Sequence, residues 1–192
     1  MLEQYNIILG SGSPRRKELL AGLGLKFEVL VRKGVSEDYP ADLSAEQVAQ
    51  YIAEEKMSAY TDLLDGKTIV ITADTVVICD NEILGKPVDE TDAKRMLRQL
   101  SGKTHKVTTG VCIATATQKT SFHVTTDVIF KELTDEEIDF YIKNYKPFDK
   151  AGAYGIQEWI GYIGVTSLKG SYFNVMGLPV QRIYDVLSKI KG

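Results

Sequence analysis

The sequence is poor in the residues that mark several specialised classes of protein. Its 192 residues include two cysteines, two histidines and one tryptophan. Cys79 and Cys112 lie in separate apolar runs without a Cys-x-x-Cys spacing, which disfavours a disulfide or a zinc site and predicts two buried, reduced thiols. His105 and His123 lack metal-ligand spacing, and no Ser-His-Asp order indicates a nucleophilic triad.

The sequence also lacks a long apolar run and an excess of charge of one sign. No stretch approaches the roughly 18 apolar residues that cross a bilayer. The 23 Lys and Arg nearly balance the 26 Asp and Glu, which leaves a net charge of −3 and argues against bulk-charge binding to a nucleic-acid polymer. Residues 1–5 lack the basic start of a signal peptide. We therefore expect a cytoplasmic protein that binds neither membranes nor nucleic acids.

What the sequence does contain is an alternation of strand-like and helix-like segments. Strands are expected at Tyr5–Gly10, Phe27–Val31, Thr68–Cys79 and Glu82–Leu84, in two long segments between Thr104 and Leu133, and in short segments around Gly161–Leu168 and Tyr172–Val175. Helices are expected to begin at Pro14, Ser44, Asp89, Thr134 and Pro179, the last with apolar residues as far as Ile190. This order predicts an α/β fold with a mixed, twisted central sheet and flanking helices. We expect one domain, residues 1–192, with two lobes around a cleft.

The strongest local signal is the run Ser-Gly-Ser-Pro-Arg-Arg-Lys at residues 11–17. It joins the first strand to the first helix, and a helix N-terminus presents free backbone N–H groups and a positive dipole end that suit an anion. Consecutive cations are unfavourable at an empty helix start, whereas a bound phosphate chain removes the conflict. Ser11 and Ser13 would offer hydroxyls, and Arg16 a bidentate fork. The alternative is an ordinary Ser-Pro cap with a solvated basic turn.

A second signal is Asp74, an acid between the apolar flanks of an expected strand. Aspartate is depleted in strands, so a carboxylate here needs a cation or a metal beside it. A hairpin turn at Asp80-Asn81 would bring Lys86 alongside the strand, opposite Thr75 with a two-residue loop or opposite Asp74 with a three-residue loop. The alternative interpretation is a structural Asp–Lys ion pair at the end of a sheet.

Three further residues are weaker candidates. Lys56 shares the inward face of the helix that begins after Ser44, so it either reaches the rim or points a charge into a cleft. Glu37, in a polar loop, is a candidate ligand for a divalent cation. Gln157 is a candidate reader of a nucleotide base, because its amide carries both a donor and an acceptor.

With these residues in place, the chain resembles the Maf family of nucleoside triphosphate pyrophosphatases. The matching stretches are SGSPRRKELL at Ser11–Leu20, TADTVV at Thr72–Val77, Gly85–Pro87, LSGKTH at Leu100–His105, DKAGAYGIQ at Asp149–Gln157 and KGSYFNVMGLP at Lys169–Pro179. Their number and order make the match specific, and together they cover nearly the whole chain.

The resemblance implies a fold like that of the inosine triphosphate pyrophosphatases, and hydrolysis of a nucleoside triphosphate between its α- and β-phosphates. It makes Asp74 the proton acceptor for the attacking water. It places Ser11, Ser13, Arg16, Lys56 and Lys86 around the phosphates, Glu37 near a metal, and Arg16, Thr75 and Gln157 at positions associated with base choice. The Tyr-Gly-Ile-Gln stretch resembles the branch that acts on dTTP and UTP, and the chemistry favours Mg²⁺ or Mn²⁺.

Two alternatives stay open on the sequence. One is a related pyrophosphatase with a different base preference. The other is a nucleotide-binding regulator of cell division or septation that does not hydrolyse its ligand. Asp74 argues against the second, because a pure binder gains nothing from a carboxylate that faces triphosphate charge. A homodimer is also left open.

Overall fold

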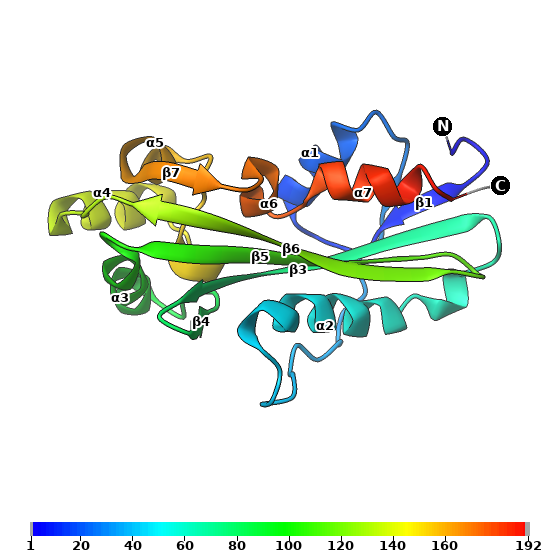
Figure 1. Cartoon of the computed structure of the whole chain (residues 1–192), viewed down its shortest axis with the longest axis horizontal. Coiled ribbons are helices and arrows are strands. Elements are labelled where there is room, and N and C mark those ends of the chain that lie inside the picture. Colours follow the sequence, from blue (N-terminus) through cyan, green and yellow to red (C-terminus); the bar gives the residue numbers. More distant parts are fainter. Residues whose placement is uncertain (1, 191–192) are drawn as a thin grey trace. The chain divides into compact units, whose positions relative to one another are not determined.

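The computed structural model describes residues 2–190, in which seven strands form a mixed sheet (Figure 1). The strands are β1 (Asn6–Leu9), β2 (Glu28–Val29), β3 (Thr68–Cys79), β4 (Glu82–Leu84), β5 (Thr104–Ala114), β6 (Lys119–Phe130) and β7 (Val165–Lys169). Their order is β2-β1-β3-β5-β6-β7, with β4 paired to β3. β1 is parallel to β2 and β3, whereas β4 and β7 are antiparallel to β3 and β6. The α/β class expected from the sequence is confirmed.

The helices begin where the sequence provides caps. They are α1 (Pro14–Ala21), α2 (Ala45–Ser58), α3 (Glu90–Leu100), α4 (Asp135–Tyr145), α5 (Trp159–Gly164), α6 (Tyr172–Met176) and α7 (Val180–Leu187), with short 3-10 turns η1 (Thr61–Leu63) and η2 (Ala151–Ala153). The capping boxes that begin at Ser44 and Thr134 both form. No helix in residues 2–190 is both long enough and apolar enough to span a membrane.

The chain divides into two compact units. The first contains the residues up to Asp74, Thr109–Val124 and the chain from Gly177 onward. The second contains Thr75–Thr108 and Thr125–Met176. Strands β3, β5 and β6 each contribute residues to both units.

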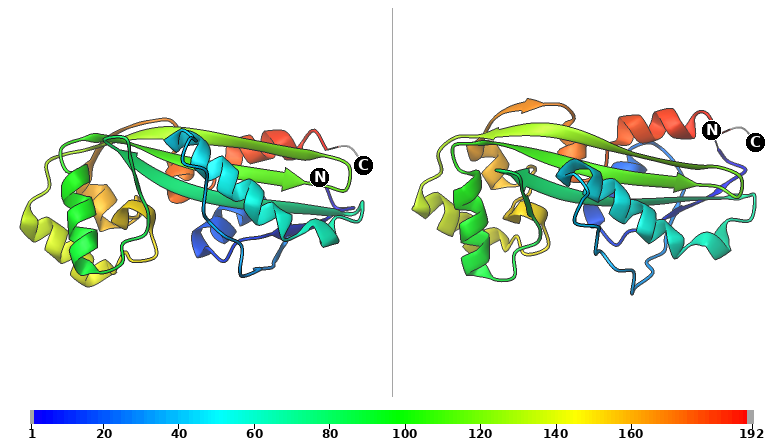
Figure 2. Two further views of the ribbon diagram at one scale, coloured as in Figure 1. Left: turned by 90° about the horizontal axis from the view of Figure 1, so that it is seen from below. Right: turned by 60° about the horizontal axis from the view of Figure 1, so that its bottom comes forward.

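In the first unit, α2 lies on one face of the sheet and α7 on the other (Figures 1 and 2). Gly110 of β5 allows α2 to approach closely, because a Cβ at Gly110 would lie 2.2 Å from the carbonyl carbon of Ala49. The Thr72 hydroxyl on β3 donates a hydrogen bond of 2.6 Å to the Ala53 carbonyl. These contacts fix α2, and with it Lys56, against β3 and β5.

The second unit packs α3 and α4 around an apolar core that includes a buried histidine. His105 is 1 % exposed, and its Nε2 lies 2.6 Å from the hydroxyl oxygen of Tyr154. Its ring also meets the Phe130 ring edge-on, with centroids 5.0 Å apart. Cys79, in this unit, and Cys112, in the first, are free and buried, as expected.

The strand expected around Gly161–Leu168 is confirmed as β7 from Val165 onward, but its first part and the strand expected at Tyr172–Val175 were wrong, and tertiary contacts explain why. The segment before Val165 is helix α5, where Gly161 packs so closely on Ile156 that a Cβ would lie 1.8 Å from the Ile156 carbonyl oxygen. The expected strand at Tyr172–Val175 is helix α6, and the buried Asn174 in it donates to the Val107 carbonyl at 3.1 Å. The apolar and aromatic pattern predicted strands, but these buried contacts favour helices. Two further elements are shorter than expected. Strand β2 covers only Glu28–Val29, and helix α7 ends at Leu187, before Ile190.

Burial of His105 predicts a pH dependence of stability. Desolvation lowers its pKa from 6.5 to about 4, so the unfolded chain binds more protons than the folded chain between those pH values. The free energy of unfolding should therefore fall as the pH drops from 6.5 to 4, by up to about 3 kcal/mol from this group. Urea unfolding of the wild type and His105→Phe at pH 7 and pH 4.5 measures it.

The exposed His123 supplies the control. His105→Phe should lose this part of the pH dependence, whereas His123→Gln should keep it. An equal fall in stability for the wild type and His105→Phe would contradict the assignment.

Candidate active site

Asp74 lies in the first unit, in the middle of β3, where most neighbouring side chains are buried. Its side chain is 16 % exposed, and its Oδ1 accepts a hydrogen bond of 2.8 Å from Lys56 Nζ. A carboxylate in such a strand needs a charged partner, and the structure provides it from α2. The cation beside Asp74 is therefore Lys56.

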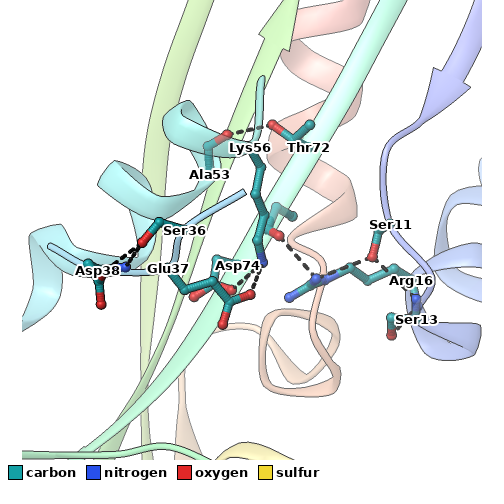
Figure 3. A network of polar contacts seen from close by, with 11 residues as sticks. Ser11, Ser13, Arg16, Ser36, Glu37, Asp38, Ala53, Lys56, Thr72 and Asp74 are labelled. Carbon is teal, nitrogen blue, oxygen red and sulfur yellow. Dashed lines mark hydrogen bonds and ion pairs between the residues drawn. The ribbon is translucent and has the colours of Figure 1, made fainter. Parts of the chain in front are cut away.

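Lys56 joins two acids (Figure 3). It stands in the last turn of α2, and its Nζ lies 2.8 Å from Asp74 Oδ1 and 2.9 Å from Glu37 Oε1. Its side chain is 21 % exposed, so the ammonium is only partly hydrated. The sequence left open whether Lys56 reaches the rim or points its charge into a cleft. In the structure its ammonium points at Asp74.

Glu37 comes from the polar segment between β2 and α2. Ser36 and Asp38 flank it in a local turn, in which the Ser36 hydroxyl donates to Asp38 Oδ2 at 2.7 Å and accepts the Asp38 N–H at 3.1 Å. The Glu37 side chain is 58 % exposed. Glu37 is therefore the solvent-facing member of the pair of acids on Lys56.

Arg16 fastens the start of α1 to two other parts of the first unit. Its Nε donates to the Gly177 carbonyl at 2.9 Å, and its Nη1 donates to the Ala73 carbonyl at 3.1 Å and to Ser11 Oγ at 3.3 Å. Burial lowers the pKa of the Arg16 guanidinium, while the charges of Asp74 and Glu37 raise it. The predicted fork toward phosphate is thus engaged with backbone oxygens, one of them on the residue before Asp74.

The two serines of the same turn are also organised. Ser11 is buried, and its hydroxyl oxygen accepts the Ser13 N–H at 3.3 Å. The Ser13 hydroxyl oxygen accepts the Arg16 N–H at 3.4 Å, which makes Ser13 the N-cap of α1. Ser11, Ser13, Arg16, Glu37, Lys56 and Asp74 all belong to the first unit. The structure brings together six of the predicted residues.

The other three predicted residues belong to the second unit. Thr75 follows Asp74 in β3, and Lys86 is exposed after β4. The β3–β4 register pairs Cys79 with Glu82, so the hairpin has the two-residue turn Asp80-Asn81. Of the two loop lengths considered for Lys86, the structure has the shorter.

Gln157 lies in a turn of the second unit, between Gly155 and Glu158. The Gly155 carbonyl accepts the Glu158 N–H at 3.0 Å across this turn. Among residues 2–190, Gln157 Oε1 is buried and accepts no hydrogen bond. A buried acceptor without a donor is unusual and needs an explanation.

The acids suit a metal only in part. Among residues 2–190, no group of three or more His, Cys, Asp or Glu side chains is arranged to hold an ion. Asp74 and Glu37 nevertheless converge on one point, the ammonium of Lys56. Mg²⁺ is commonly held by one or two carboxylates, with waters and substrate phosphates completing its shell. Because the Lys56 ammonium occupies that point, the exposed Glu37 carboxylate is the donor that fits a metal arriving with a phosphate ligand.

Comparison with known proteins identifies the family of this chain. Residues 6–190 match the family model described as Maf-like protein. The chain belongs to the Maf family. The "dTTP/UTP pyrophosphatase" of Phocaeicola vulgatus is 58 % identical over 189 residues, which are 98 % of each chain. The protein of the same name from Porphyromonas gingivalis ATCC 33277 is 53 % identical over 188 residues, 97 % of this chain and 94 % of its own.

The solved structures that match are more distant in sequence. A HAM1 protein from Coxiella burnetii is 14 % identical, with a TM-score of 0.48 over 97 % of this chain and all of its own.

Sequence reasoning missed three features of this Maf chain. It did not find that Arg16 binds the carbonyls of Ala73 and Gly177, because backbone acceptors leave no mark in a sequence. It named neither the Thr72–Ala53 bond nor the contacts of Tyr141, whose hydroxyl donates to Glu158 at 2.6 Å. The sequence around Tyr141 gives no signal of a polar role for its hydroxyl.

The contacts of Arg16 predict that it stabilises the fold. Arg16→Ala should lower the free energy of unfolding by about 1–3 kcal/mol, because it leaves two backbone acceptors without their donors. Lys17→Ala is the control, since Lys17 is the exposed next residue of the same basic turn and should change stability by less than about 0.5 kcal/mol. Urea unfolding measures both, and equal losses would show that the Arg16 contacts contribute nothing specific.

Proposed function

We propose that this protein hydrolyses nucleoside triphosphates, with UTP and dTTP preferred, to a nucleoside monophosphate and pyrophosphate. The names of its Maf relatives support the reaction and the two substrates. The observation that carries the proposal is the Asp74 carboxylate, held by Lys56 in an otherwise buried strand. A carboxylate that is fixed and partly desolvated can accept a proton from water.

Asp74 acts as the general base. It takes the proton of a water molecule whose oxygen attacks the α-phosphorus, and the bond from that phosphorus to the bridging oxygen of the β-phosphate breaks. Pyrophosphate leaves with the electron pair of that bond. Lys56 holds one carboxylate oxygen of Asp74, which orients the other toward the water.

The charged surroundings of Asp74 balance the charge of the triphosphate. Lys56 and Arg16 supply positive charge, and Ser11 and Ser13 supply hydroxyls at the start of α1. Lys86, exposed in the second unit, is a further proposed phosphate ligand. Charge-assisted contacts of this kind hold phosphate groups strongly.

A divalent metal, Mg²⁺ or Mn²⁺, is part of the proposal. Glu37 is the residue that would hold it, because its carboxylate is 58 % exposed and a metal that also binds substrate phosphates needs only one or two carboxylates from the protein. When bound, the metal neutralises negative charge that develops on the phosphate oxygens. We also place the reaction in the cytoplasm; the homodimer stays a prediction.

Base choice is assigned to Arg16, Thr75 and Gln157. The Gln157 amide can donate to O4 and accept from N3–H of uracil or thymine, whereas cytosine presents the reverse pattern. A site built for one edge discriminates strongly against the other.

Asp74→Asn tests the catalytic role. The amide cannot accept the proton, so kcat for UTP should fall by about 10²–10⁴-fold while nucleotide binding persists. Asp38→Asn is the control, since this acid of the same unit bonds Ser36 rather than Lys56. Steady-state kinetics with pyrophosphate detection and calorimetric Kd values measure the effect, and near-normal turnover of Asp74→Asn would remove Asp74 from the base role.

A substrate series tests the base preference. The wild type should show its highest kcat/KM with UTP and dTTP, with lower values for CTP, ATP and GTP. Gln157→Ala should reduce this preference more than it reduces the best rate, because the amide discriminates between bases and takes no part in the chemistry. A wild type that prefers purines, or a variant with an unchanged ranking, would contradict the assignment.

A further inference from the structure

In the second unit, one tyrosine hydroxyl holds both ends of the turn that carries Gln157. The hydroxyl oxygen of Tyr141, on α4, accepts the Gly155 N–H at 3.0 Å, and the same hydroxyl donates to Glu158 Oε2 at 2.6 Å. Gly155 and Glu158 are the first and last residues of the turn. Tyr141 itself is fully buried, so its position is fixed by the core.

A buried lysine completes this network. Lys150 is 8 % exposed, and its Nζ lies 3.0 Å from Glu158 Oε1 and 2.9 Å from Asp149 Oδ1. The two oxygens of Glu158 are thus held by different partners, Lys150 on one and Tyr141 on the other. These contacts restrict rotation of the Glu158 side chain and movement of the backbone at this position.

The Gln157 amide is packed inside this frame. A Cβ on Gly155 would lie 3.0 Å from Lys150 Cε and 3.3 Å from Gln157 Nε2, so the bare glycine leaves room for both side chains. Gly161 packs against the carbonyl of Ile156, a residue of the same turn. The Gln157 amide is therefore packed against the turn whose ends Tyr141 holds.

We infer that Tyr141 is a positioning residue for base selection, which acts by holding the 155–158 turn so that the Gln157 amide presents one fixed donor–acceptor pattern. This inference rests on the proposed base contact of Gln157. An amide that can rotate by half a turn offers cytosine the pattern that it offers uracil, so discrimination requires the orientation to be fixed. Tyr141 supplies that constraint without touching the nucleotide.

The hydroxyl is suited to this task at every working pH. Burial and the neighbouring Glu158 carboxylate raise the pKa of Tyr141 far above its ordinary value, so it stays a donor to Glu158 and an acceptor for Gly155. Lys150 is a further charged group that faces Glu158, and it also contacts Asp149.

The test compares binding of two analogues that cannot be cleaved, the α,β-imido derivatives of UTP and CTP, by calorimetry. The wild type should bind the uridine analogue more tightly, and Tyr141→Phe should reduce the ratio of the two Kd values by about tenfold or more. Tyr145→Phe is the matched control, because Tyr145 lies on the same helix and its contact with the network is a ring stacked on that of Tyr141. The control should keep the wild-type ratio.

A double variant separates positioning from general destabilisation. If Tyr141 acts through Gln157, then Tyr141→Phe should not change the Kd ratio further in a Gln157→Ala background. Gly155→Ala provides a second route, since it leaves the Tyr141 hydroxyl in place and crowds the Lys150 side chain and the Gln157 amide. Gly155→Ala should also reduce the ratio of the two Kd values. It keeps the inference testable if Tyr141→Phe does not fold.

The outcomes decide between the claims. An unchanged ratio in both Tyr141→Phe and Gly155→Ala, or an equal loss with and without Gln157, would overturn the inference. A wild type that binds both analogues equally would also overturn it. A wild type that discriminates in binding but does not hydrolyse UTP would refute the proposed function alone, because the Kd ratios of the variants still decide the role of Tyr141.

Discussion

The contact between Lys56 and Asp74 is the interaction on which the candidate site depends. Without Lys56, β3 would carry an unpaired carboxylate in a largely buried strand, which is strongly destabilising. The contact in turn requires α2 to lie close to the sheet, and Gly110 and the Thr72 hydroxyl bring it there. Packing in the first unit thus serves to place one ammonium beside one carboxylate.

Arg16 shows how a residue type can be identified correctly while its contacts are not. The basic turn at residues 11–17 was predicted as a phosphate site, and Arg16 does carry positive charge toward Asp74 and Glu37. Its guanidinium is nevertheless bonded to the carbonyls of Ala73 and Gly177. Arg16 therefore holds the backbone next to Asp74. The same hydrogen bonds hold the Arg16 guanidinium, and its positive charge, near the Asp74 carboxylate.

Much of the fold could be predicted because local chemistry determines it. The bounds of β3 and β4, the Asp80-Asn81 turn and the helix starts at Ser44 and Thr134 are as predicted. Helices α5 and α6 were missed because they depend on contacts with distant residues, such as the bond from Asn174 to the Val107 carbonyl. The candidate site residues were named from their types, their spacing and the resemblance to the Maf family. The partner of Asp74 could not be named, because a sequence does not show which lysine the folded chain places beside it.

The most direct test of the central claim is the fate of the attacking oxygen. Hydrolysis of UTP in water enriched in ¹⁸O, followed by mass spectrometry of both products, shows which phosphorus the water attacks. Activation of water by Asp74 for attack on the α-phosphorus predicts ¹⁸O in UMP and none in pyrophosphate. Label in the pyrophosphate, or release of inorganic phosphate in place of pyrophosphate, would contradict the account.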